Sequence, residues 1–346
     1  MAINLAEAFR EQGHDVTLWS PHPLPPQTKW WQSIQQMRSK LNTFIETQQP
    51  FDVIDIPGGA GLITRKVSQL NSVIVARSVQ PPILYILRSL SDCRGISPKE
   101  TIRNLIKYLY SIFLIFLVLQ DWKRAKYILC LGSLEMQWTR KWFPWWKKKL
   151  AYYINALSKA DQEALSEIRL YRRKPDGEGI RFLWIGRWNA QKGTNELLDF
   201  IVKRTALDSR DTFTIAGCGS EAEKDCPLKL LESGKIRFLP SFERSQLGSL
   251  LASHDVGLFT SKVEGWGLVL NEMLESGMTV FANSVGGVPD LKPYFKEILT
   301  SFPPSSELTA RDLVVKNIQE DYYQKFNWKA IASYYLNLLS LENHQK

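Results

Sequence analysis

Two glutamates stand at the ends of the segment EGWGLVLNE, Glu264 to Glu272. The apolar spacing predicts a helix that begins near Gly267, so Glu264 lies in the preceding loop and Glu272 more than one turn inside the helix. The first N–H groups of a helix have no partner within it and attract anions. A phosphate bound there would have Glu272 beside its ribose hydroxyl groups and Glu264 beside a sugar. The alternative for Glu264 is an acid that only stabilises its own helix.

The backbone around this anion site is rich in glycine. Gly265 and Gly267 interrupt the chain after a predicted strand, and the N–H groups expected to face an anion belong to Trp266, Gly267, Leu268 and Val269. The sequence therefore predicts a phosphate site made mainly of main-chain donors.

Two earlier segments also follow predicted strands. LWIGRWNAQKG places Gly186 and Arg187 after one strand and Lys192 before a helix, where a guanidinium and an ammonium group suit a diphosphate. A solvated basic pair in an exposed loop is the alternative. Gly217 and Gly219 follow another strand and would let the backbone approach a ligand closely, although an ordinary strand-to-turn transition explains them equally well.

Predicted strands and helices alternate through both halves of the chain, which indicates parallel sheets covered on both faces. The predicted strands cover residues 14–20, 51–59, 71–79 and 125–133 in the first half, and 180–188, 211–219, 235–240, 256–261 and 278–284 in the second. Ligands of such sheets bind beyond the carboxyl ends of the strands, where all the residues above are expected. We therefore predict an α/β protein with two doubly wound, Rossmann-like domains.

The domain boundaries are predicted from length and composition. A chain of 346 residues favours two domains. The stretch from Asn155 to Gly179 is polar and ends in Pro-Asp-Gly, so we expect domains over 1–160 and 180–325 with a linker over 161–179.

Composition narrows the class of protein. The formal net charge of +9 suggests an acidic partner such as a nucleotide, a phospholipid surface or nucleic acid. The four cysteines show no C-x-x-C spacing, which favours a reducing, cytoplasmic compartment over a disulfide framework or a zinc site. No secretory leader is expected at the start of the chain. The uncharged run Tyr108–Gln120 is shorter than a membrane span. We expect the apolar stretch Leu105–Leu119 to form a helix buried in its domain; the alternative is that it adds to a membrane-binding surface.

Four of these segments together resemble the family 4 (group 1) glycosyltransferases of GT-B fold. EGWGLVLNE is similar to that family's E-x7-E motif, and MLESGMTVFANSVGGVPDL continues the match. GRWNAQKG is similar to its G-R-x-x-x-x-K-G motif, and LAEAFREQGHDVTLWSP to its N-terminal L-A-x-x-L-x-x-x-G-H-x-V. The resemblance implies two domains that face a cleft, and a closing helix over 326–346 that returns to the first domain.

The resemblance also implies a function: a retaining transferase that takes a sugar from a nucleotide-sugar donor. Arg187 and Lys192 would bind the diphosphate and stabilise the charge of the leaving group, Glu272 would bind the ribose, and Glu264 the transferred sugar. The sequence contains no D-x-D, so a metal-held diphosphate is not supported and no cofactor is expected. The acceptor, lipid-linked or polysaccharide, is left open.

The N-terminal half departs from the family pattern. Met1 lies inside the family's first helix, so its first strand and Gly-Gly loop are missing. Val79 stands where the family often has a histidine, with Arg77 and Ser78 beside it, and only Asn155 remains of the usual P-N-G-V-D. Either the coding start lies upstream or the first sheet lacks a strand. The second hypothesis is therefore a truncated or inactive protein that binds a nucleotide sugar without transferring it.

A basic aromatic segment, Trp138–Leu150, holds four tryptophans and five basic residues without an acid. Such a composition suits an anionic membrane surface, and we expect peripheral association at the cytoplasmic face. A nucleic-acid patch is the alternative, but no nucleic-acid-binding signature accompanies it.

Overall fold

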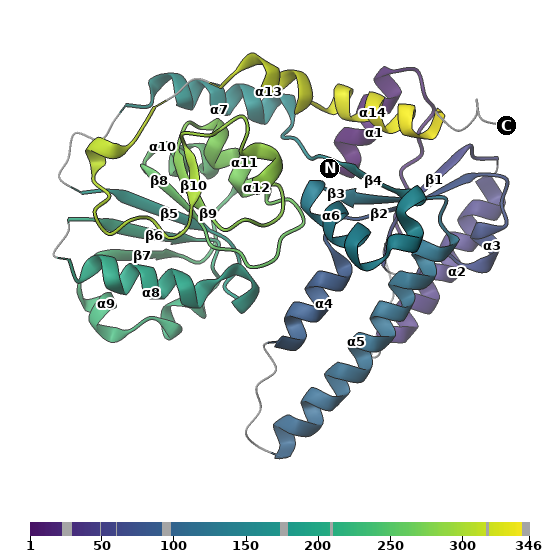
Figure 1. Cartoon of the computed structure of the whole chain (residues 1–346), viewed down its shortest axis with the longest axis horizontal. Coiled ribbons are helices and arrows are strands. Elements are labelled where there is room, and N and C mark those ends of the chain that lie inside the picture. Colours follow the sequence, from purple (N-terminus) through teal and green to yellow (C-terminus); the bar gives the residue numbers. More distant parts are fainter. Residues whose placement is uncertain are drawn as a thin grey trace. The chain divides into compact units, whose positions relative to one another are not determined.

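The computed structural model of the chain describes residues 1–22, 30–48, 50–59, 61–91, 98–173, 179–207, 210–315 and 318–340. The chain divides into two compact units (Figure 1). The first unit combines Met1–Asn155 with Trp328–Lys346, and the second is Ala156–Asn327. Each unit contains one parallel sheet.

The sheet of the first unit has its four strands in chain order, β1-β2-β3-β4. They are β1 (Val53–Pro57), β2 (Val73–Arg77), β3 (Tyr127–Leu131) and β4 (Leu150–Tyr153). The helices of this unit are α1 (Ala2–Glu11), α2 (Trp30–Gln48), α3 (Arg65–Ser68), α4 (Pro82–Ser91), α5 (Pro98–Arg124), α6 (Ser133–Trp142), the 3-10 helix η1 (Pro144–Lys149) and α14 (Trp328–Ser340). Strand β3 is buried along its whole length because helices cover the sheet.

The first predicted strand, residues 14–20, is wrong: the chain is irregular there. A strand needs a neighbour to complete its ladder of hydrogen bonds, and no described strand of the sheet pairs with this segment. Strand β4 follows the basic aromatic segment and was not predicted. It pairs with β3 from Leu150 opposite Ile128 onward.

The last helix, α14, belongs to the first unit and packs on α1. The ring of Tyr335 meets that of Phe9 with centroids 5.3 Å apart, and Ser333 donates a hydrogen bond of 2.9 Å to the side chain of Gln12. The Tyr335 hydroxyl also donates to Asp55 of β1 over 3.1 Å. The helix expected to return to the first domain thus contacts both its first helix and its first strand.

The sheet of the second unit has the order β10-β9-β8-β5-β6-β7, in which every neighbouring pair is parallel. Its strands are β5 (Arg181–Ile185), β6 (Thr212–Ala216), β7 (Ile236–Leu239), β8 (Val256–Phe259), β9 (Thr279–Ala282) and β10 (Leu299–Ser301). The α-helices are α7 (Lys159–Tyr171), α8 (Thr194–Thr205), α9 (Leu228–Glu232), α10 (Leu247–Ala252), α11 (Leu268–Glu275), α12 (Val288–Leu291) and α13 (Glu320–Lys325). The 3-10 helices are η2 (Ala190–Lys192), η3 (Ala222–Asp225), η4 (Arg244–Gln246) and η5 (Ala310–Asp312).

The predicted linker over 161–179 is wrong for most of its length, because α7 occupies it. Ser158 caps this helix by accepting a hydrogen bond from the Asp161 N–H. At its other end, Arg169 donates to the carbonyl of Glu275 over 2.5 Å and Arg172 to that of Ser276 over 2.8 Å. These cations satisfy carbonyls at the C-terminal end of α11. The second unit therefore begins at Ala156; residues 174–178 lie outside the described part.

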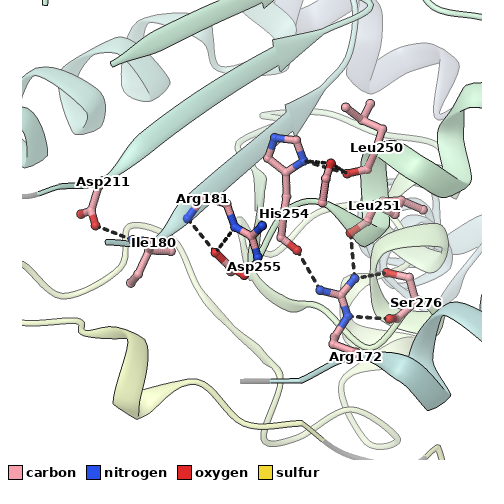
Figure 2. A network of polar contacts seen from close by, with 10 residues as sticks. Arg172, Ile180, Arg181, Asp211, Leu250, Leu251, His254, Asp255 and Ser276 are labelled. Carbon is pink, nitrogen blue, oxygen red and sulfur yellow. Dashed lines mark hydrogen bonds and ion pairs between the residues drawn. The ribbon is translucent and has the colours of Figure 1, made fainter. Parts of the chain in front are cut away.

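The amino edge of the second sheet is closed by a network of polar contacts, shown in Figure 2. Asp255 accepts from both the backbone N–H and the guanidinium of Arg181 at the start of β5. Asp211 accepts from the Ile180 N–H over 2.7 Å. Arg172 donates to the carbonyls of Leu251 and His254 near the end of α10. These contacts satisfy backbone groups of Ile180, Arg181, Leu251 and His254 at the amino edge of the sheet.

The apolar stretch Leu105–Leu119 is not the buried helix that we expected. It lies in α5, whose stretch Asn104–Arg124 has a mean hydropathy of 1.5 and is only 28% buried. This stretch is long and apolar enough to cross a membrane by length and composition. Only its C-terminal part packs into the core of the first unit.

Candidate active site at the carboxyl edge of the second sheet

Most residues predicted for the donor site lie just beyond the carboxyl ends of the strands of the second sheet, and Leu268 and Glu272 lie in the helix that follows β8. Arg187 follows β5, Gly217 follows β6, Glu264 follows β8, and Gly286 follows β9. Strands β6, β5, β8 and β9 are consecutive neighbours. Because parallel strands end at the same edge, these four loops share one rim of the sheet.

Lys192 and Glu264 form an ion pair across this rim. Ser261 donates a second hydrogen bond, of 2.9 Å, to the same carboxylate oxygen. The Lys192 side chain is 23% exposed and that of Glu264 9%. The backbone of Lys192 is held in place, because the Thr260 hydroxyl donates a hydrogen bond of 2.7 Å to the Lys192 carbonyl. Two charges that the sequence separates by 72 positions thus act as one partly desolvated unit.

Glycine is required where η2 turns into α8. Gly193 has a φ of +69°, and a Cβ on it would lie 2.0 Å from the carbonyl oxygen of Thr260. Glycine is also required at position 267. Gly267 has a φ of +90°, and a Cβ added to it would lie 2.6 Å from the ring of Phe259. These two close approaches keep η2 and the start of α11 tightly against the end of β8.

The start of α11 presents free donors. Among the described residues, no protein group accepts a hydrogen bond from the N–H of Trp266, Gly267, Leu268 or Val269. The Trp266 carbonyl accepts from the Gly287 N–H over 2.9 Å, which ties this loop to the one after β9. Four main-chain donors at one helix end can bind an anionic group.

The Trp266 side chain has a structural task. It is 2% exposed, and its indole N–H donates to Asn271 over 2.7 Å. The Asn271 amide donates in turn to the Tyr322 hydroxyl over 3.1 Å, and that hydroxyl donates to Glu275 over 2.6 Å. Only the backbone N–H of Trp266 is therefore placed to meet a ligand.

Glu272 lies one turn into α11 and is 4% exposed. Burial raises its pKa, and the guanidinium of Arg244 beside it partly offsets that rise. Arg244 forms ion pairs with both Glu272 and Asp161, the latter at 2.9 Å. The sequence did not single out Arg244, although its place at the start of the helix predicted after β7 was a usable signal.

Arg187 is exposed and, within the described part of the chain, forms no hydrogen bond or ion pair. Its charge is therefore available to a ligand, unlike that of Lys192. Gly217 and Gly219, with φ of +68° and +75°, donate their N–H groups to the carbonyls of Leu239 and Pro240. Gly186 packs on the ring of Trp184, and a Cβ added to Gly186 would lie 3.2 Å from that ring. In the described residues no group of three or more His, Cys, Asp or Glu is arranged to hold a metal ion.

The carboxyl edge of the first sheet has its own polar cluster. Ser78 donates to Glu135 over 2.7 Å, and the Leu131 N–H donates to the other oxygen of that carboxylate. Complete burial raises the pKa of Glu135 to about 7. Arg77 forms a 2.8 Å ion pair with Asp55. These side chains are satisfied by one another.

Val79 lies next to this cluster. It stands where the resembling family often has a histidine, and it is 49% exposed.

Comparison with known proteins relates part of the chain to a sequence family and identifies its fold. Residues 170–311 match the sequence profile described as Glycosyl transferases group 1. An uncharacterized glycosyltransferase of Methanocaldococcus jannaschii is 26% identical over 174 residues, which are 46% of this chain and 44% of that protein. The alignments cover less than half the length of the curated relatives.

Two solved structures resemble the whole chain. Sucrose-phosphate synthase from Thermosynechococcus elongatus has a TM-score of 0.64 at 16% identity, covering 99% of this chain and 92% of its own. The HepE protein of Anabaena, in complex with UDP and glucose, has a TM-score of 0.60 at 16% identity, covering 92% and 84%. At this identity the likeness establishes the fold.

Proposed function

We propose that the chain transfers a sugar from a nucleotide-sugar donor to an acceptor with retention of configuration. The match of residues 170–311 to the group 1 glycosyltransferase profile and the GT-B fold support this proposal. The observation that carries the proposal is the arrangement at one rim of the second sheet. There the free N–H groups of α11 lie between two buried carboxylates, Glu264 before the helix and Glu272 within it. Such a site suits a diphosphate flanked by two groups that bear hydroxyls.

In the absence of a donor, each carboxylate of the site is paired with a cation of the chain, and these ion pairs support specific roles. Lys192 neutralises Glu264, and Arg244 neutralises Glu272. An incoming diphosphate would attract Lys192 and the exposed Arg187, which would release the Glu264 carboxylate for the hydroxyls of the transferred sugar. Glu272 would accept hydrogen bonds from the ribose.

The chemical step follows from charge. When the bond between sugar and diphosphate breaks, negative charge develops on the phosphate oxygen that leaves. Arg187, Lys192 and the N–H groups of α11 are the groups of this chain that would stabilise that charge where it appears. Binding energy used in this way lowers the barrier instead of only tightening the ground state. This division of roles needs no metal ion.

UDP and glucose bound to the Anabaena protein support a nucleotide sugar as the substrate class here. We test this by thermal stabilisation with a panel of nucleotide sugars, because a ligand that binds only the native state raises the melting temperature. The anomeric configuration of the product, measured by NMR, tests retention. Product of inverted configuration would contradict the mechanism, and stabilisation by none of the donors would contradict the binding site.

A nucleotide-sugar-binding protein without transfer activity is the second candidate. The satisfied cluster of Ser78, Glu135 and Arg77 favours it, because these groups leave few free side chains at the carboxyl edge of the first sheet. Donor-dependent stabilisation without turnover or donor hydrolysis would select this candidate.

We further propose that the protein works at the cytoplasmic face of a membrane, through the basic aromatic segment Trp138–Leu150. Trp142 and Trp145 of this segment are 58% and 68% exposed. Its exposed basic residues are Arg140, Lys141, Lys147 and Lys148. Trp138 and Trp146 instead pack against the core of the first unit, so two of the four tryptophans serve the fold.

A further inference from the structure

Helix α5 presents an apolar stripe where a water-facing helix would carry polar residues. The stripe consists of Leu105, Leu109, Ile112 and Phe116, which are 53–63% exposed. Their spacing of three and four places them on one face of the helix, over about 17 Å. Figure 1 shows α4 and α5 running away from the sheet of their unit, and the two helices pack on each other. All four side chains of the stripe stay more than half exposed in the described structure.

Between Leu105 and Phe116 the polar residues Lys107 and Ser111 lie on the other side of α5. At 3.6 residues per turn, Lys107, Ser111 and Asp121 fall opposite the stripe. Ser111 and Asp121 are buried, at 6% and 0% exposed. From Leu105 to Phe116 the stripe is therefore apolar without interruption by a charge, while the exposed Lys107 lies opposite it and the exposed Lys123 lies beyond its end. An apolar stripe with polar residues opposite is the arrangement of a helix that lies in a membrane interface.

The C-terminal part of α5 cannot leave the protein. Val118 and Trp122 are 1% and 3% exposed in the core. Asp121 accepts backbone hydrogen bonds from Gly61 over 2.8 Å and from Ile63 over 3.1 Å. Crossing a bilayer with Asn104–Arg124 would break this packing and bury the Asp121 charge in lipid. The fold thus favours a helix lying in the plane of one leaflet over a span.

The basic aromatic segment is fixed to the same helix. The ring of Trp146 meets that of Trp122 with centroids 5.7 Å apart. Lys149 donates to the carbonyls of Lys123 and Ala125, at 2.9 and 2.7 Å, where α5 ends. An apolar stripe and a group of exposed cations on one rigid support are complementary to a lipid surface with anionic headgroups.

We propose that the stripe of α5 seats in the acyl boundary of an anionic membrane, with the helix parallel to the surface. This deepens the proposed peripheral location and rests on it, while being independent of sugar transfer. It assigns the two features separate tasks: the cations of Trp138–Leu150 attract the protein to the surface, and the stripe retains it. Attraction by exposed charges is screened by salt, whereas burial of apolar surface is not.

The test is flotation of the full chain with vesicles of phosphatidylcholine, with and without phosphatidylglycerol, at about 0.1 M and about 1 M salt, where the screening lengths are roughly 10 and 3 Å. The stripe variant carries Leu109→Gln, Ile112→Gln and Phe116→Gln. The cation variant carries Arg140→Gln, Lys147→Gln and Lys148→Gln, and spares Lys149 because it holds α5. The matched control places Gln at Leu170, Leu207 and Leu228, exposed by 71%, 55% and 74% in the other unit.

We expect the stripe variant to lose roughly 10-fold or more in partitioning at both salt concentrations, since each apolar side chain adds several buried CH₂ groups. The cation variant should lose binding mainly at low salt, and the control should bind like wild type. Melting temperatures, compared for all variants, show that each is folded.

The remaining outcomes separate the two proposals. A stripe variant that floats like wild type, beside a cation variant that does not, overturns the seating of α5 and leaves the peripheral location standing. Wild type that floats under no condition overturns both. A wild-type dimer that the stripe variant converts to a monomer, with unchanged flotation, assigns the stripe to a second copy of the chain instead.

Discussion

Arg244 and Glu272 form an ion pair between η4 and the second turn of α11, and the same guanidinium reaches Asp161 of α7 at 2.9 Å. The pair holds ionised a carboxylate that burial would otherwise favour in its protonated form. It also occupies the group that we assign to the ribose. Donor binding is therefore linked to whether Glu272 pairs with Arg244 or binds the ribose.

Replacing Arg244 by alanine should make donor affinity depend on pH. Without the guanidinium the pKa of Glu272 rises further, so a larger fraction of the carboxylate that accepts the ribose hydrogen bonds is protonated as the pH falls. We expect donor affinity to fall more steeply with decreasing pH in Arg244→Ala than in the wild type. Calorimetric titrations at several pH values measure it. Arg244→Lys, which retains the charge, should behave like wild type, and a flat profile in Arg244→Ala would count against the link.

Glu272→Ala should weaken binding of the nucleotide sugar. Hydrogen bonds to a charged acceptor are worth about 1.5–3 kcal/mol, which corresponds to roughly 10–150-fold in affinity. Calorimetry on the folded variant checks this, with Glu163→Ala on the exposed face of α7 as a control. Unchanged donor affinity in Glu272→Ala would remove this residue from the site.

Arg187→Ala should lower kcat more than it raises the donor KM, because its charge is needed most when the diphosphate leaves. Its melting temperature should stay at the wild-type value, since Arg187 is exposed and forms no contact within the described residues. The exposed Lys203 of α8, changed to alanine, is a matched control. An Arg187→Ala enzyme with intact kcat and a raised KM would refute the leaving-group role.

Lys192→Ala should show the same kinetic effect together with a loss of stability. It leaves Glu264 almost buried without its ammonium partner, a change that costs on the order of 3 kcal/mol for buried pairs. Urea unfolding and steady-state kinetics separate the two effects. Lys192→Ala combined with Glu264→Gln should recover most of the stability and none of the activity; recovery of activity would show that the pair is purely structural.

Glu275 should make the protein less stable as the pH rises from about 5 to 8. Burial raises its pKa from 4.5 to about 7, and its Oε2 atom has no hydrogen-bond partner in the described structure. Because the folded-state pKa is raised, the stabilisation is complete below the unfolded pKa and is lost as the pH rises through 7. The difference is on the order of 3 kcal/mol.

Urea unfolding of Glu275→Gln across this pH range tests the assignment. The amide can keep the hydrogen bond from Tyr322 and does not titrate, so the pH slope should flatten. Glu223→Gln, at an exposed position, should keep the wild-type slope. Identical slopes in all three proteins would show that Glu275 does not titrate in this range.

The sequence by itself determined most strands of the second sheet and the rim at which the residues that we assign to the donor lie. Apolar runs followed by glycines predicted β5, β6, β8 and β9, and the carboxyl ends of parallel strands necessarily meet at one rim. Gly193 and Gly267 were visible as glycines, but the carbonyl and the ring that forbid a Cβ there belong to Thr260 and Phe259, which only the folded chain brings near.

The tertiary structure decided which charges meet and which apolar residues stay exposed. Lys192 pairs with Glu264, 72 positions later in the sequence, and Arg244 with Glu272, 28 positions later. At such separations the spacing of residues in the sequence does not predict a contact. Residues 14–20 have the composition of a strand and remain irregular, because a strand exists only where a neighbour completes its ladder. The apolar run of α5 has the composition of a core helix, yet burial depends on what packs against a helix, and Leu105, Leu109, Ile112 and Phe116 stay more than half exposed.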